Sequence, residues 1–91
     1  MKIDVYDTYA ASKSGKTIHF DVLLPNGDGK EKAVTFAREF LEKIGESADS
    51  LKQERCNFCH SENADSQLQE YINKHGHYIL QMENCPNPFN S

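Results

Sequence analysis

Apolar and polar side chains alternate through most of the first 24 residues, and this pattern constrains the fold more than any other in the chain. Ile3 and Val5 alternate with Asp4, Tyr6 and Thr8. In the next segment the alternating apolar positions are Ile18, Phe20, Val22 and Leu24, set against Thr17, His19, Asp21 and Leu23. A period of two is typical of a strand with one buried face. The polar segment 12–16 contains a glycine suited to a hairpin loop, so we predict antiparallel strands at 2–10 and 17–24.

Two apolar stripes in the rest of the chain predict helices. The first runs from Ala33 to Ile44, with Gly45 as its stop. The second lies between a cap at Asn63 or Asp65 and a stop at Gly76. Segments 51–58 and 77–83 are predicted to be strands, and the charged side chains of 51–58 favour an edge position.

The predicted element order is ββαβαβ, which indicates an α+β protein. We expect one mixed four-stranded sheet with two helices packed on one face, because right-handed crossovers between parallel strands place their helices on the same side. The length of 91 residues indicates one domain, expected at 1–85, with a loose C-terminal tail at 86–91.

Charge and hydropathy narrow the range of functions. The formal net charge is −4, and no block of basic residues forms the positive stripe that nucleic acids require. The chain opens as a strand without a secretory signal, and no apolar run approaches the roughly 20 residues of a membrane span. We therefore expect a soluble cytoplasmic protein that binds neither nucleic acid nor membrane. In a reducing compartment, clustered cysteines more often bind metal or act in catalysis than form disulfides.

The C-x-x-C-H motif of Cys56, Cys59 and His60 is the clearest candidate for chemistry. In the expected parallel crossover the third and fourth strands end at the same sheet edge, which would bring Cys85 to this motif. Thiolates at tetrahedral geometry select zinc. We therefore expect zinc on the three cysteines. His60 is a candidate fourth ligand, although neighbouring side chains tend to point apart; Glu83, Asp21 or water are the alternatives.

Other interpretations of the cysteines stay open. A C-x-x-C segment before a helix is also typical of thiol redox sites, and a nucleophilic cysteine would need His60 or His19 as its base. Covalent haem attachment would require an export signal that the sequence lacks. Cysteine is also a common small buried residue with no chemical role.

A second candidate binding site lies on the predicted strands. His19 and Asp21 share one strand face, and we expect Tyr6, Thr8 and Asp4 to share it with them. Such an open face would present His19, Asp21 and Tyr6 to a small ligand or a partner. The simpler interpretation is an ion pair on the sheet surface.

Several segments also resemble a known family. They are residues 4–9 (DVYDTY), 19–22 (HFDV), 58–61 (FCHS) and 82–85 (MENC). In combination they are similar to the small bacterial family named domain of unknown function number two thousand and twenty-four. The resemblance implies a ββαβαβ domain of bacterial origin and brings no activity or site residue.

Three functional hypotheses follow. The first is a non-enzymatic binding or accessory domain with a structural zinc on its cysteines. The second is a redox or nucleophilic thiol site, which leaves open whether the protein is an enzyme. The third is a protein-interaction module with purely structural cysteines, in which a protein partner or a second copy of the chain would bind through the edge strand or the open sheet face.

Overall fold

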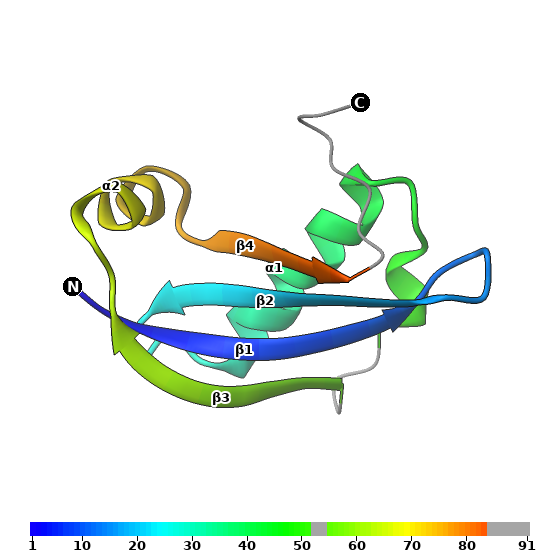
Figure 1. The fold of residues 1–91 in the computed structure, drawn as a ribbon, viewed down its shortest axis with the longest axis horizontal. Coiled ribbons are helices and arrows are strands. Elements are labelled where there is room, and N and C mark those ends of the chain that lie inside the picture. Colours follow the sequence, from blue (N-terminus) through cyan, green and yellow to red (C-terminus); the bar gives the residue numbers. More distant parts are fainter. Residues whose placement is uncertain (52–54, 84–91) are drawn as a thin grey trace.

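A computed structural model describes residues 1–51 and 55–83, which form a four-stranded sheet and two α-helices (Figure 1). The elements are β1 (Lys2–Ala11), β2 (Thr17–Pro25), α1 (Lys30–Lys43), the short 3₁₀ helix η1 (Ala48–Ser50), β3 (Cys56–Asn63), α2 (Ser66–His75) and β4 (Tyr78–Glu83). The ββαβαβ order and the α+β class are thereby confirmed. The tail predicted at 86–91 lies outside the described residues.

The sheet is antiparallel throughout, with strand order β3-β1-β2-β4. The prediction of a mixed sheet was therefore wrong. The β1–β2 hairpin forms the centre of the sheet. β3 pairs with the free side of β1, and β4 pairs with the free side of β2, each in the antiparallel direction. Consequently β3 and β4 lie at opposite edges and are not linked by a parallel crossover. The edge position predicted for the third strand is confirmed.

The two helices pack against opposite faces of the sheet, so the prediction of one shared face was also wrong. Alternate residues of β1 enter two separate apolar clusters, and this is possible only if both strand faces are covered. The main cluster lies between α1 and the sheet and contains Phe20, Leu24, Phe40 and Leu41. In the smaller one Ile72 of α2 packs with Ile3, Val5 and Leu23.

The bounds of β3 differ from the predicted strand at 51–58. Leu51 is buried but follows η1, and β3 begins only at Cys56. As an edge strand β3 leaves most of its side chains exposed, so it lacks the alternation by which a strand is identified. The C-x-x-C-H motif therefore lies within β3 rather than after it. Residues 52–54 are outside the described part of the chain.

The termini of α2 follow from local signals in the sequence. The Asp65 side chain accepts a 2.8 Å hydrogen bond from the backbone N–H of Leu68, which confirms this residue as the N-cap. Gly76 ends the helix in the left-handed conformation, with φ of 84°. In Figure 1, α2 lies at the end of the sheet where β3 ends and β4 begins. Within residues 1–51 and 55–83, no helix lies above the other half of this sheet face.

Neither α-helix in the described residues is long and apolar enough to cross a membrane.

Candidate functional site

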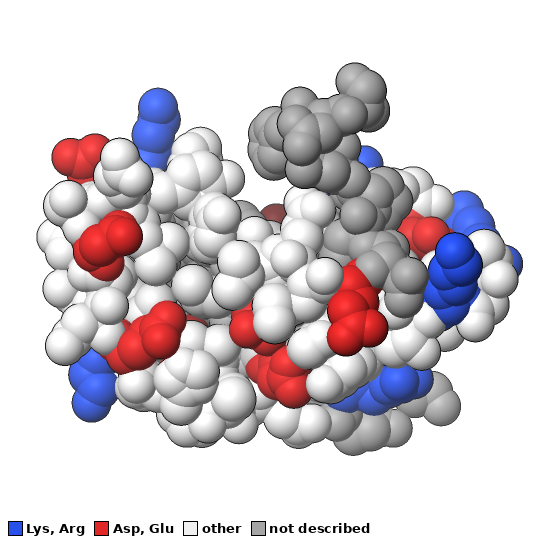
Figure 2. Space-filling view, viewed as in Figure 1, with Lys and Arg blue, Asp and Glu red and all other residues white. Residues whose placement is uncertain are grey.

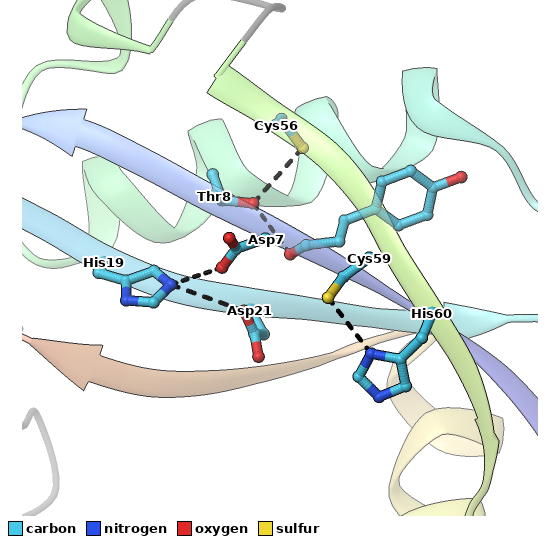
Figure 3. A network of polar contacts seen from close by, with 8 residues as sticks. Asp7, Thr8, His19, Asp21, Cys56, Cys59 and His60 are labelled. Carbon is cyan, nitrogen blue, oxygen red and sulfur yellow. Dashed lines mark hydrogen bonds and ion pairs between the residues drawn. The ribbon is translucent and has the colours of Figure 1, made fainter.

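Three ionisable side chains meet on the sheet face that α2 leaves uncovered. Register pairs Asp7 of β1 with Asp21 of β2, and Tyr9 with His19. Because paired residues share a face, the side chains of Asp7, Asp21 and His19 project together, as Figure 3 shows. One ligand atom from each of these three residues lies within 4.8 Å of the other two.

The imidazole of His19 connects the two carboxylates. Its Nε2 atom lies 2.5 Å from Oδ1 of Asp7 and 3.9 Å from Oδ1 of Asp21. The ring stacks on Tyr9, with centroids 4.3 Å apart and ring planes 9° from parallel. The His19 and Asp21 side chains are only 16% and 15% exposed, whereas that of Asp7 is 35% exposed. The cluster is therefore a fixed, half-buried arrangement.

The two carboxylates have pKa values displaced in opposite directions. Burial raises the pKa of Asp21, and its hydrogen bond with Asp7 and the negative charge of that residue raise it further. Burial also acts to raise the pKa of Asp7, but hydrogen bonds from His19, Asp21 and Tyr9 and the charge of His19 outweigh it and lower the pKa. The close approach of the two carboxylates thus opposes the ionisation of Asp21 and favours that of Asp7.

A second polar group lies on the neighbouring edge strand. The β1–β3 pairing shifts register between Val5 and Tyr6, where Cys59 is the extra residue of β3. The Sγ atom of Cys59 lies 3.3 Å from Nδ1 of His60, whose Nε2 lies 3.2 Å from Oε2 of Glu62. The prediction that Cys59 and His60 point apart was wrong, because a bulge breaks the strict alternation of a strand.

The structure separates the other predicted site residues. Cys56 is fully buried in the cluster beneath α1, where the Thr8 hydroxyl donates a 3.4 Å hydrogen bond to its sulfur. Cys59, by contrast, is exposed, and neither thiol is in a disulfide. Cys85 lies outside the described residues, and the strand order places β4 at the edge of the sheet opposite to β3 and Cys56, so the parallel crossover that was expected to join them does not exist.

Tyr6, Thr8 and Asp4 do not share the face of His19, contrary to the prediction. Tyr6 packs in the cluster beneath α1 and makes an edge contact with Phe58, with ring centroids 5.8 Å apart. The error was one residue in register: the hairpin pairs Ala11 with Thr17, so Asp7 rather than Tyr6 lies beside Asp21 on the same face.

Sequence reasoning therefore missed Asp7 and Tyr9. The signal that could have found them is the length of the hairpin loop, because five residues between Ala11 and Thr17 determine every pair along β1 and β2. Glu83, one of the alternative zinc ligands, pairs with His19 at the end of β4.

A groove of about 540 Å³ lies along β4, between α1 and α2. Its lining combines aromatic rings, histidines and the two charged residues Glu39 and Lys43. No residue of the Asp7–His19–Asp21 cluster or of the Cys59–His60–Glu62 group lines it. The groove is thus separate from both polar groups.

Comparison with known proteins identifies the family. The chain matches the family described as Domain of unknown function (DUF2024) over residues 1–82. It is also similar to protein NE1680 from Nitrosomonas europaea, whose NMR structure superposes with a TM-score of 0.82 at 42% sequence identity over 94% of this chain and 100% of that one. No curated protein matches it. The chain therefore belongs to the DUF2024 family.

Proposed function

We propose that the protein is a small binding domain whose ligand is a divalent metal ion held by Asp7, His19 and Asp21. The observation that carries this proposal is the convergence of two carboxylates and one imidazole within 4.8 Å on the uncovered sheet face. Carboxylate oxygen and imidazole nitrogen are ordinary ligands of zinc and of other borderline divalent cations. The proposal moves the expected zinc away from the cysteines, of which Cys56 is buried and hydrogen-bonded to Thr8.

The spacing of the ligand atoms fits an ion after small movements. Zinc bonds to nitrogen and oxygen are about 2.0–2.1 Å long, so two ligands of one ion lie about 3.0–3.4 Å apart. The distances of 2.5 Å from His19 to Asp7 and 3.9 Å from His19 to Asp21 lie on either side of this range. Asp7, the most exposed of the three, has the most freedom to adjust.

The electrostatics of the cluster also favour a cation. Two carboxylates within hydrogen-bonding reach repel each other, and the raised pKa of Asp21 reflects its neighbour's charge as well as its burial. A divalent ion would neutralise both carboxylates. The stacked Tyr9 ring would hold the imidazole in place for coordination.

Isothermal titration of chelator-treated protein with Zn²⁺ tests this proposal. We expect one ion per chain, and we expect His19→Gln and Asp7→Asn each to weaken binding by at least about tenfold. Asp28→Asn is the matched control, because this aspartate lies outside the cluster and pairs with Lys32. Zn²⁺ binding that survives in the two cluster variants but is lost in Cys59→Ser or Cys85→Ser would overturn the proposal in favour of a cysteine site.

A further inference from the structure

Three side chains on β3 form a line from a thiol to a carboxylate. Sγ of Cys59 lies 3.3 Å from Nδ1 of His60, and Nε2 of His60 lies 3.2 Å from Oε2 of Glu62. A nucleophile, a base within hydrogen-bonding reach and a group that orients the base are the parts of an activated thiol site. These residues have no role in the metal site proposed above.

The hydrogen bonds fix the tautomer that such a site needs. Glu62 has only acceptor oxygens when ionised, so Nε2 of a neutral His60 ring carries the proton and donates it to this carboxylate. Nδ1 is then unprotonated and accepts from the Cys59 thiol. The imidazole can therefore take the thiol proton directly.

The site is open to solvent because of its place in the sheet. β3 is an edge strand, and the bulge at Cys59 brings its side chain and the adjacent His60 ring to the same side. Cys59 is exposed, and the side chains of His60 and Glu62 are 52% and 50% exposed. A small molecule can thus reach the sulfur without any opening of the fold. Cys56, three residues earlier, is fully buried.

We propose that Cys59 is a reactive thiol that exchanges with small disulfides. In this step the proton of the Cys59 thiol passes to Nδ1 of His60 as the sulfur attacks one sulfur of the disulfide. A new S–S bond to Cys59 forms, the original S–S bond breaks, and the departing thiolate takes the proton back from His60. The product is a mixed disulfide and a free thiol, so no other oxidant is consumed.

The charge around the thiol selects among disulfides. The Glu62 carboxylate belongs to the site, and the Asp7–His19–Asp21 cluster lies on the same sheet face. Figure 2 shows Asp and Glu side chains over the middle of this face, with Lys and Arg at its margins. The chain also carries a net charge of −4. A cationic or neutral disulfide is therefore favoured over an anionic one.

The test measures the rate of mixed-disulfide formation by mass spectrometry of the intact protein, with chelator present so that metal binding plays no part. Cys85→Ser serves as the background, which leaves Cys59 and the buried Cys56. We expect cystamine, a dication, to modify one thiol about tenfold faster than glutathione disulfide, an anion, with the difference shrinking in 1 M salt. Adding Cys59→Ser should abolish this modification.

Variants of His60 and Glu62 test whether the reactivity of Cys59 depends on its base or only on its exposure to solvent. We expect His60→Gln to slow the reaction with cystamine about tenfold, while His75→Gln on α2 leaves the rate unchanged. Glu62 is a positioning residue: Glu62→Ala should slow the reaction severalfold, and Glu62→Gln, whose amide oxygen still accepts from His60, should restore most of the rate. A rate unaffected by His60→Gln, or equal rates for the two disulfides in the background protein, would overturn the proposal.

Discussion

The hydroxyl of Ser61 donates a 2.7 Å hydrogen bond to Oδ1 of Asp4 and so joins β3 to β1. The same carboxylate accepts from Nδ2 of Asn26 at 2.8 Å and from the backbone N–H of Gly27 at 3.0 Å. Asp4 is only 6% exposed. Asp4→Ala would leave these donors without their acceptor, and we expect the free energy of unfolding to fall by about 2–3 kcal/mol in urea titrations at pH 7.

Asp28→Ala provides the comparison for this loss. The Asp28 carboxylate lies 3.7 Å from Nζ of Lys32, whose side chain is 62% exposed. An exposed pair of this kind contributes less than about 0.5 kcal/mol. Equal destabilisation by the Asp4 and Asp28 variants would contradict the role assigned to the buried carboxylate.

The same carboxylate should make stability depend on pH in the acid range. Hydrogen bonds from the Gly27 backbone and from Ser61 lower the pKa of Asp4 below its ordinary value of 3.8. The unfolded chain therefore binds a proton at this carboxyl at a higher pH than the folded chain does. Its stabilisation is complete above the unfolded pKa and is lost as the pH falls through the folded pKa.

We therefore expect the difference in unfolding free energy between the native protein and Asp4→Asn to be constant from pH 8 to about pH 5 and to shrink below about pH 4. Urea titrations at successive pH values measure it. A difference that grows toward acid pH would show that the ionised Asp4 carboxylate destabilises the folded protein.

Ile72 secures α2 against the sheet. It is 1% exposed, and it is the buried residue of this helix, packed with Ile3, Val5 and Leu23. Ile72→Ala should lower the free energy of unfolding by about 2–4 kcal/mol. Leu80→Ala, at a position that is 42% exposed, should cost less than about 1 kcal/mol. If α2 were held mainly by its polar contacts, the two substitutions would have similar effects.

Hydrogen exchange adds a local readout to the Ile72 comparison. Amide protons of α2 should exchange faster in Ile72→Ala than in Leu80→Ala, while those of α1 change in proportion to global stability alone.

The sequence was informative where the signal is local. The hairpin, the cap at Asp65 and the stop at Gly76 were predicted and are present, because each depends on residues close together in the chain. The faces of β1 were not predictable in the same way. Ile3 and Val5 pack under α2, while Tyr6 packs under α1, so both faces of the strand are apolar and alternation does not say which face adjoins His19.

The order of the strands depends on contacts between distant segments. β3 pairs with β1 across a long stretch of chain, 48 residues for the pair of Thr8 with Cys56. The exposed side chains of β3 carry little information about its partner. The convergence of Asp7 with Asp21 could have been derived from the length of the loop between β1 and β2. The proximity of Cys59 to His60 depends on a β-bulge, which the amino-acid sequence of β3 does not indicate. The cysteine motif was thus expected at the end of a strand, whereas it lies within β3, and its geometry was not predicted.

Gly76 should resist substitution for two reasons. Its φ is +84°, and a Cβ atom there would lie 3.4 Å from Cζ of Phe36. Gly15 has a similar φ of +86° but open space around it. We expect Gly15→Ala to cost about 1 kcal/mol from backbone strain and Gly76→Ala to cost more, at about 1.5–2.5 kcal/mol, in thermal or urea unfolding. An equal cost would mean that Phe36 moves aside freely.

Cys56 should be protected from reagents as long as the protein stays folded. Its side chain is fully buried, and burial raises the pKa of its thiol although the hydrogen bond from Thr8 acts in the opposite direction. Iodoacetamide reacts with the thiolate, so both inaccessibility and the small thiolate population oppose labelling. At pH 8 we expect labelling of Cys56 in the folded protein to be at least about a hundredfold slower than in unfolding urea, because it requires a rare opening.

Thr8→Ala tests whether Cys56 is protected mainly by its inaccessibility or by its small thiolate population. The substitution removes the hydroxyl donor and leaves a small cavity beside the sulfur. Local opening then becomes easier, and labelling of Cys56 should accelerate in proportion to the lost stability, while the rate at exposed Cys59 stays the same. Peptide mapping after short labelling times gives the two rates separately. Labelling of Cys56 as fast as Cys59 in the unsubstituted folded protein would contradict its placement in the core beneath α1, and with it the assignment of reactivity to a single thiol of the motif.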